Sequence, residues 1–309
     1  MKKLLFFFIL CLNISVCFAE DIDVFKLVED GTPEQLKSAL KSGAKFNVKR
    51  SIYNFDDYSQ ENIEDWLFSS NETPLHRAAA YNHNPESIKF LIDQGLDVNA
   101  IGENGNYASE NPLACALWYK NTAAVKELLK AGADPNAWTE GGYNFVGTPC
   151  HIVAFEYGDH PFWAIDVITA IVQAGGSVNN HKELSKERLR ELSENEPDFG
   201  ENNTIFLPRD QWTSDEPFFN MTGFFSHYAM GNFLATFTPL MWAVIYDNKN
   251  IVDIFLDFNA DVNLLSVENK SAFDYANDLP PNSKIKKSST FKRLQLAAAH
   301  KKLERPQRK

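Results

Sequence analysis

Residues 111–137, NPLACALWYKNTAAVKELLKAGADPNA, contain two consecutive helical segments. In the second segment Val125, Leu128 and Leu129 recur at the spacing of one helix face, and Gly132 supplies the left-handed turn that ends it. The first segment consists mostly of small residues, yet Trp118 and Tyr119 stand together at its end. A helix pair of this size cannot bury its apolar face alone, so the pattern predicts that several pairs stack on one another.

The same two-helix pattern occurs four times in the chain. The first helices begin with TPLHRAAAY at residue 73, NPLACALWY at 111, TPCHIVAFE at 148 and TPLMWAVIY at 238. Each is followed by a second apolar helix and by a turn such as GLDVNA or GADPNA. These motifs closely resemble those of the ankyrin repeat. The resemblance covers full repeats at about residues 73–100, 111–137, 148–180 and 238–264.

The resemblance implies an all-α ankyrin-repeat solenoid of about six helix pairs, occupying residues 20–302. More polar, degenerate pairs at residues 22–48 and 268–302 are expected to cap its ends. Successive starts at 73, 111 and 148 lie 38 and 37 residues apart, against about 33 in the family. The extra residues are expected to extend the β-hairpin fingers, and about six more stand near YGDHPFW, between the two helices of the third repeat.

The TPLH-like openings carry their own local chemistry. Threonine is expected to cap the first helix, and proline at the first helical position loses no hydrogen bond. His76 and His151 occupy the histidine position of the motif, where the resemblance implies that the ring fixes the turn by hydrogen bonds. Cys115 and Cys150 are expected to remain reduced, because stacked helices lie about 8–10 Å apart, beyond comfortable disulfide reach.

The N-terminus has the pattern of a signal peptide over residues 1–19. Lys2 and Lys3 precede an apolar run from Leu4 to Leu12, and the small-residue exit ends at Ala19. The sequence therefore predicts an exported, periplasmic or secreted, protein whose mature chain begins at Glu20 and has no membrane span. An uncleaved anchor and a lipoprotein acylated on Cys17 remain the alternatives.

Charge is unevenly distributed along the chain. The net charge is −11 for the whole sequence and −13 without the two N-terminal lysines. Residues 280–309 hold ten Lys/Arg and only Glu304, so residues 20–279 carry about −22. Such an acidic body should repel nucleic acid and anionic lipid. The basic tail at residues 303–309 is expected to be a solvated end, with an acidic partner or a membrane surface as the alternative.

The residues that follow the small residues of each first helix form the candidate partner surface. The resemblance implies that they lie near the concave face, which with the fingers is the usual partner surface of the family. Adjacent pairs stack about 10 Å apart, and aromatic residues are typical interface anchors. The alternative is that the fingers and the insertion cover these rings. The predicted partner-binding residues are Tyr81, Trp118, Tyr119, Phe155, Glu156, Ile245 and Tyr246, with Tyr107, Trp138 and Tyr143 on the fingers.

A long insertion occupies residues 181–237. It begins with the polar, helix-like KELSKERLREL and becomes rich in aromatic residues from 204 to 237. These rings either pack on the solenoid or form a recognition loop. We expect the insertion to loop outward at the finger edge, because each repeat leaves an apolar face that only its neighbour covers. The helix around Val167 and Ile168 would then pack directly on the helices that contain Trp242 and Ile254.

The sequence contains no motif of nucleophilic, metal-dependent or nucleotide chemistry. We therefore expect a monomeric, non-enzymatic scaffold that binds a partner protein, without cofactor or metal. The alternative is an enzyme or small-ligand-binding protein with its site in the insertion, where Arg209, Asp210, His227 and Tyr228 stand. The acidic cluster between Asp56 and Asp65 is expected to be a solvated finger, with calcium binding as its alternative.

Overall fold

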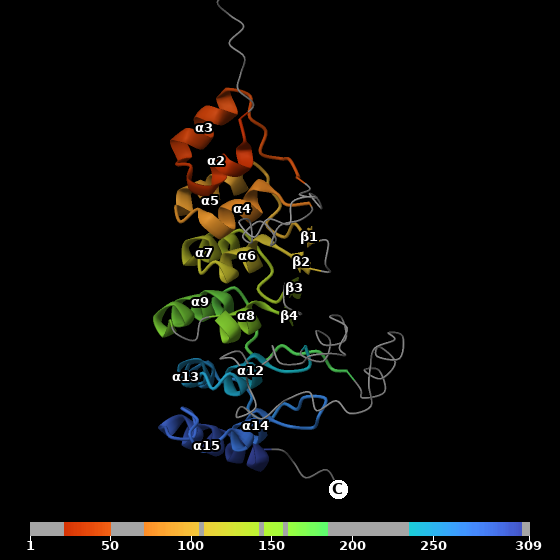
Figure 1. Ribbon diagram of the computed structural model, residues 1–309, viewed down its shortest axis with the longest axis vertical. Coiled ribbons are helices and arrows are strands. Elements are labelled where there is room, and N and C mark those ends of the chain that lie inside the picture. Colours follow the sequence, from red (N-terminus) through yellow and green to blue (C-terminus); the bar gives the residue numbers. More distant parts are fainter. Residues whose placement is uncertain are drawn as a thin grey trace, which may run out of the picture.

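The computed structural model describes residues 22–50, 71–104, 108–141, 145–156, 160–184 and 235–304. Twelve helices stack in chain order over these ranges, with short strands along one side (Figure 1). This arrangement confirms the all-α repeat fold. The helices are α2 Val24–Asp30, α3 Pro33–Lys41, α4 Pro74–Tyr81, α5 Pro85–Asp93, α6 Pro112–Trp118, α7 Thr122–Lys130, α8 Pro149–Glu156, α9 Pro161–Gln173, α12 Pro239–Ile245, α13 Lys249–Asp257, α14 Ala272–Asp278 and α15 Ser289–Glu304.

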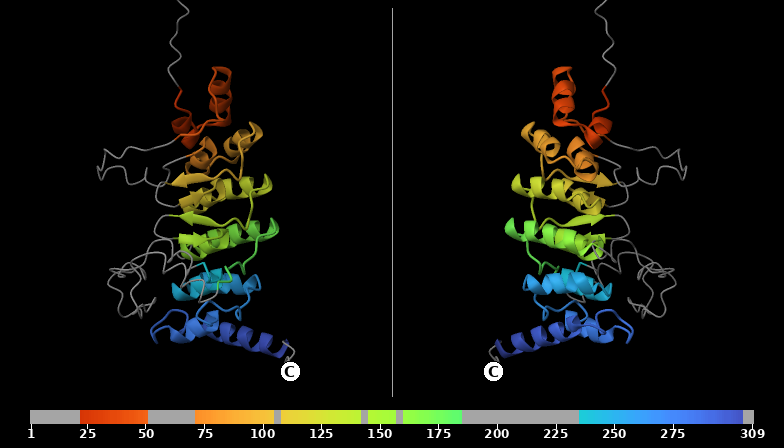
Figure 2. Two further views of the ribbon diagram at one scale, coloured as in Figure 1. Left: turned by 90° about the vertical axis from the view of Figure 1, so that its right-hand side faces the viewer. Right: turned by 90° about the vertical axis from the view of Figure 1, so that its left-hand side faces the viewer.

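The helices form two rows that run the length of the stack (Figure 2). One row contains α2, α4, α6, α8, α12 and α14, each in contact with the next, and the other contains α3, α5, α7, α9, α13 and α15. The apolar core lies between the rows and continues from Val28 to Ala298. Because every pair is covered only by its neighbours, the stability of the stack depends on these successive interfaces.

The predicted helix openings are confirmed by their hydrogen bonds. Thr238 precedes Pro239, the first residue of α12, and its side chain accepts from the backbone N–H of Met241 at 3.2 Å. Asn111 does the same for α6, accepting from Ala114 at 2.8 Å. At the turn after α7, Gly132 has a φ of +91°, a left-handed conformation that glycine adopts without strain.

His76 and His151 fix the turns at the starts of α4 and α8. The Nδ1 atom of His151 accepts the backbone N–H of Thr148 at 3.0 Å, so Nε2 carries the proton and donates to the carbonyl of Phe237 at 2.8 Å. His76 makes the equivalent bonds to Thr73 and to the carbonyl of Glu110. Burial lowers the pKa of each histidine to about 4, because the charged ring would lose its hydration. Both rings are therefore neutral at pH 7.

The strands join into one sheet across two repeats. β1 (Gly102–Asn104) pairs with β2 (Ala108–Glu110), and β3 (Thr139–Gly141) pairs with β4 (Phe145–Gly147), both antiparallel. A bridge between Ser109 and Glu140 connects β2 to β3, giving the order β1-β2-β3-β4. The two hairpins are therefore paired with each other, a contact between repeats that the residue spacing within a single repeat did not indicate.

The two sides of the insertion are held together at its base. The backbone N–H of Lys182 donates to the carbonyl of Ala235 at 2.7 Å. Helix α8 contacts α12 and α9 contacts α13, which confirms the predicted direct packing of the third on the fourth repeat. Phe237, assigned above to the insertion, is fully buried and lies 5.3 Å from the ring of Tyr275, so it belongs to the core. Residues 185–234, which include the four candidate site residues of the insertion, lie outside the described residues.

Two further boundaries differ from the sequence prediction. Helix α15 runs to Glu304, two residues into the predicted basic tail, whose remaining residues lie outside the described part. The residues Pro161, Phe162 and Trp163, expected between the helices of the third repeat, form the first turn of α9. The acidic finger cluster and residues 1–19 are not among the described residues. Cys115 and Cys150 are both buried and free, as predicted.

Candidate functional site

Aromatic side chains stand where the first helices end. Tyr81 is the last residue of α4, Trp118 is the last of α6 and Phe155 is the penultimate residue of α8. Tyr119 and Tyr246 are the C-cap residues that follow α6 and α12. These helices have only seven or eight residues, counted from the proline of their Thr-Pro or Asn-Pro opening, so the four repeats place their rings at the same end of the first helices.

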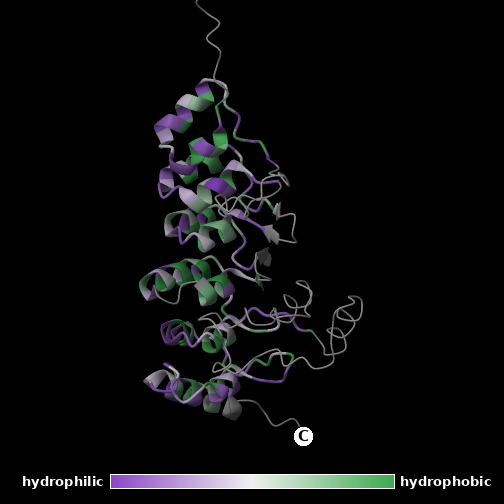
Figure 3. Ribbon diagram, in the orientation of Figure 1, coloured by the Kyte–Doolittle hydropathy of each residue, from purple (hydrophilic) through white to green (hydrophobic). Residues whose placement is uncertain are grey.

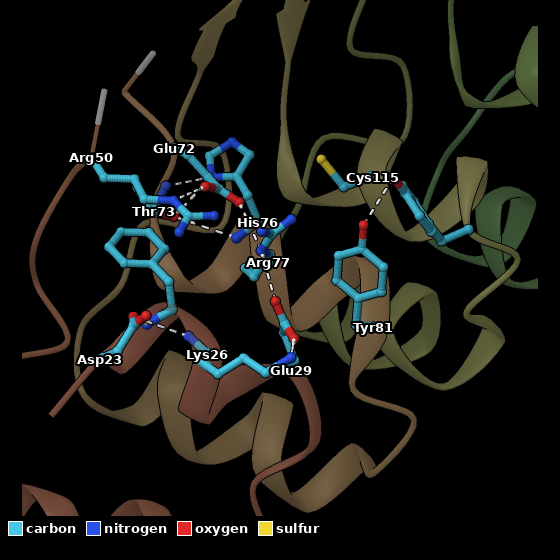
Figure 4. A network of polar contacts seen from close by, with 12 residues as sticks. Asp23, Lys26, Glu29, Arg50, Glu72, Thr73, His76, Arg77, Tyr81 and Cys115 are labelled. Carbon is cyan, nitrogen blue, oxygen red and sulfur yellow. Dashed lines mark hydrogen bonds and ion pairs between the residues drawn. The ribbon is translucent and has the colours of Figure 1, made fainter. Parts of the chain in front are cut away.

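The first two rings form a pair between neighbouring repeats. The rings of Tyr81 and Tyr119 lie 4.8 Å apart in an edge-to-face arrangement, and the hydroxyl of Tyr81 donates to that of Tyr119 at 3.1 Å (Figure 4). The guanidinium carbon of Arg77 lies 5.2 Å from the centre of the Tyr81 ring. Burial and the bond from Tyr81 raise the pKa of Tyr119, which therefore remains a neutral phenol.

A larger ring cluster spans the second, third and fourth full repeats. Phe155 stands edge-to-face with Trp118 at 6.0 Å, with Trp242 at 6.2 Å and with Tyr246 at 5.2 Å. Trp242 stacks on Tyr246 at 6.0 Å. Adjacent residues Trp118 and Tyr119 link this cluster to the tyrosine pair along the chain. We call the whole set the ring strip: Tyr81, Trp118, Tyr119, Phe155, Trp242 and Tyr246.

Trp242 is the member of the ring strip that sequence comparison of the helix ends missed. It lies one turn before Tyr246 and is only 3% exposed, so it forms the side of the strip that is buried in the core. Its ring also lies 6.1 Å from His151, which in turn lies 5.6 Å from Trp138. Trp138 is thereby connected to the strip through a buried histidine. The signal available in the sequence was its position four residues before Tyr246, one helical turn away.

The ring strip is partly buried and partly open to solvent. Phe155 is 37% exposed, whereas Tyr81, Trp118, Tyr119 and Tyr246 are half-buried and pack against the core. Ile245, also half-buried, packs there too. These rings therefore lie at the edge of the apolar core. The alternative, in which the fingers and the insertion cover them, concerns residues outside the described part and stays a prediction. Tyr107 and Tyr143 lie outside the described residues, as does the side chain of Glu156.

A charged network lies beside the tyrosine end of the strip (Figure 4). Arg50 Nε contacts Glu72 Oε2 at 2.6 Å, and its guanidinium carbon lies 4.4 Å from the centre of the Phe25 ring. Arg77 Nε lies 3.1 Å from Glu29 Oε1 and 3.6 Å from Glu72 Oε1. Glu72 is only 1% exposed, and a buried charge is tolerated when it is paired in this way. The network joins the first pair of helices to α4, and no sequence motif indicated it.

A buried carboxyl lies beside the thiol of Cys115. Glu110, at the end of β2, is 5% exposed, and the thiol of Cys115 donates to its Oε2 across 3.9 Å. Burial raises the pKa of Glu110 to about 8, so this side chain is mostly protonated at pH 7. The burial that acts on Glu110 also raises the pKa of the Cys115 thiol, which makes it a poor nucleophile.

The described residues contain no group of three or more His, Cys, Asp or Glu side chains arranged to hold a metal ion. Among the helices of these residues, none has the length and apolar character needed to cross a bilayer.

Comparison with protein families agrees with the repeat architecture. A family model of ankyrin repeats in three copies matches residues 27–138, and a model of a single ankyrin repeat matches residues 237–266. A search of curated proteins gave no match to the chain. The matched ranges contain every member of the ring strip except Phe155. The stacked helix pairs of this chain therefore include ankyrin repeats, at residues 27–138 and 237–266.

Proposed function

We propose that the chain is a non-enzymatic scaffold, exported from the cell that makes it, that binds a partner protein through the ring strip and the adjoining fingers. Ankyrin repeats suggest a protein–protein interaction scaffold. The observation that carries the proposal is the continuous ring cluster from Trp118 to Tyr246, with Phe155 exposed at its centre. Aromatic side chains held rigidly at a partly open surface are the usual energetic anchors of protein interfaces.

The charge of the chain defines the kind of partner. Residues 20–279 carry about −22, so long-range attraction favours a protein with a basic or mixed surface. Two classes fit the proposal: a toxin or enzyme that is neutralised in the periplasm, and a host protein bound by a secreted effector. Nucleic acid does not fit, because its phosphates would be repelled.

The binding surface is tested by capture from the compartment in which the protein resides. We expect the parent chain to retain a protein that Phe155→Ala and Trp118→Ala lose or bind at least tenfold more weakly, since anchor residues contribute about 2 kcal/mol or more. Leu296→Ala is the matched control, because Leu296 is 53% exposed on α15 and lies outside the strip. Equal capture by the strip variants and the parent, with all chains folded by circular dichroism, would sink the proposal.

Export is tested separately. We expect the chain recovered from the producing cell's periplasm or medium to begin at Glu20, as measured by intact mass. A cytoplasmic protein that retains residues 1–19 would contradict export without bearing on the ring strip.

A further inference from the structure

Helix α9 is longer than the second helices of the other full repeats. Helices α5, α7 and α13 each have nine residues, whereas α9 has 13. When the helices are aligned at the turn that follows them, the additional residues form one extra turn at the start of α9. In Figure 1, α9 reaches further to the left than α7 and α13. The extra turn presents Phe162 and Trp163, which are 85% and 47% exposed.

One side of the outward face of α9 carries an apolar stripe, beside Asp166, which is exposed and ion-paired with Lys126 of α7. Phe162, Ile165, Thr169 and Val172 alternate at spacings of three and four residues, the pattern of a helix–helix seam. Phe162, Ile165 and Val172 are all exposed. The hydroxyl of Thr169 donates to the carbonyl of Ile165 at 2.7 Å, so it is bonded within the helix. We call these four residues the α9 stripe.

The equivalent faces of the neighbouring second helices are charged. Aligned at the following turn, the position of Thr169 is occupied by Lys89 in α5, Lys126 in α7 and Asp253 in α13. Each of these charges is in an ion pair, with Asp93, with Asp166 of α9 and with Lys249 respectively. Figure 3 shows the same contrast, with hydrophobic colour along most of α9 and hydrophilic colour on α5, α7 and α13. An exposed apolar stripe on one helix of an otherwise charged row indicates a contact surface.

We propose that the α9 stripe is the interface between two copies of this chain, packed as an antiparallel α9 pair. The four stripe residues are spaced symmetrically about position 167 in the sequence. A two-fold axis that crosses the α9 pair at the level of Val167 therefore places Phe162 opposite Val172 of the second copy. The same axis places Ile165 opposite Thr169 of the second copy. Large side chains thus meet small ones, which is the self-complementarity that a two-fold interface requires.

The flanking helix α13 supplies charge complementarity to the same arrangement. Aligned at the following turn, Ile251 of α13 corresponds to Val167 of α9, and α13 packs beside α9. Lys249 and Asp253 stand at equal distances on either side of Ile251. Within each copy Lys249 and Asp253 form an ion pair at 2.8 Å, and Asp253 lies 2.7 Å from Arg293 as well. The axis that pairs the α9 stripes brings Lys249 of one copy toward Asp253 of the other, so the two ion pairs meet with opposite charges facing and add a weak attraction.

The size of the surface sets the strength of the contact. With side-chain areas of about 150–250 Å² for the larger residues, the exposed fractions of Phe162, Ile165 and Val172, together with that of the adjoining Trp163, correspond to roughly 400 Å² per copy. A total of about 800 Å² is at the low end for specific interfaces, so we expect a reversible dimer with a Kd on the order of 10–100 µM. The proposed dimer departs from the monomer expected from the sequence.

The dimer also extends the proposed function. The α9 stripe lies on the row of second helices, whereas the ring strip lies on the row of first helices. Pairing through α9 leaves both ring strips open and gives one assembly two binding surfaces. Two linked sites raise the avidity for a partner that is itself repeated or clustered.

Sedimentation equilibrium of the full chain between about 1 and 200 µM tests the dimer, a range chosen to bracket the expected Kd. We expect the parent mass to rise toward twice the monomer, and Phe162→Lys to remain monomeric over the whole range. Leu296→Lys is the matched control on α15, and it should associate like the parent. Both substituted residues are exposed, so circular dichroism should show native helix content in each variant.

The register is tested by charge pairing. Val172→Glu alone should prevent association, and the double variant Phe162→Lys with Val172→Glu should restore it, because the introduced charges then face each other across the axis. A parent chain that stays monomeric, a Phe162→Lys variant that still dimerises, or a double variant that does not recover would each overturn the proposal. So would a monomeric parent that binds phosphatidylcholine vesicles through Phe162, because the occupant would then be a lipid surface.

Discussion

Because His76 and His151 are buried and neutral, we predict that the folded chain loses a defined amount of stability over a defined acidic pH range. The pKa of His76 and of His151 is about 4 in the folded chain, against the usual 6.5. The stability that these neutral rings support is fully present above pH 6.5. As the pH falls, the unfolded chain binds protons at both positions while the folded chain does not, so stability is lost between pH 6.5 and about 4. Each histidine should cost roughly 3 kcal/mol over that window, at about 1.4 kcal/mol per pKa unit.

The perturbation that isolates this effect is the double variant His76→Gln with His151→Gln. Glutamine does not titrate, so the free energy of unfolding of the parent should fall more steeply than that of the variant. The difference in slope should approach 2.7 kcal/mol per pH unit, about 1.4 from each histidine. Glu110 acts with the opposite sign, because its raised pKa favours the folded state as the pH falls from 8 to about 4.5. Its contribution is common to both chains and cancels in the difference.

The assay is urea unfolding followed by tryptophan fluorescence at pH 7.5, 6.0, 5.0 and 4.5. The variant is expected to start less stable, because it loses the hydrogen bonds to the carbonyls of Glu110 and Phe237. The slope, not the starting value, is therefore the readout. Parallel curves for the parent and the variant between pH 6.5 and 4.5 would refute the reasoning, since the histidines would then titrate alike in both states.

Three further predictions concern single elements of the stack. As the pH rises from 5 to 8.5, the free energy of unfolding of Glu110→Gln should increase by several kcal/mol relative to that of the parent. The substitution removes a buried carboxyl that the unfolded chain ionises and the folded chain does not; equal pH profiles would contradict this. Asp247→Ala should lose about 2–4 kcal/mol and speed hydrogen exchange in α14 and α15, because the carboxylate accepts from Ser283 Oγ and two backbone N–H groups of the next pair. The control Asp278→Ala, which breaks an exposed ion pair, should change stability by less than about 0.5 kcal/mol. A similar loss of stability in Asp247→Ala and Asp278→Ala would show that the buried hydrogen bonds of Asp247 contribute no more than an exposed ion pair. Replacement of residues 185–232 by a short Gly/Ser linker should leave one cooperative unfolding transition in calorimetry, since α8 and α9 pack directly on α12 and α13; two separated transitions would show that the segment is part of the core.

The sequence alone determined the repeated unit. Thr-Pro openings, the histidine at the turn and a left-handed residue after each second helix are local features, so each acts within a few residues of its own position. Thr238, His151 and Gly132 therefore take the conformations that their motifs predicted. The sequence also placed the rings of the candidate site at equivalent helix ends, because four copies of one pattern align without reference to a neighbour.

Only the tertiary structure decided what each residue faces. The contacts of Trp242 with Phe155 and His151, the burial of Phe237 and the joining of β2 to β3 all occur between repeats. The partners in these contacts lie up to 91 positions apart in the chain, as His151 and Trp242 do, and no local pattern specifies them. The extra turn of α9 was present in the sequence as inserted residues, but its exposure depends on where neighbouring helices end. Periodicity gives the faces of a helix, and packing against other elements decides which face meets solvent.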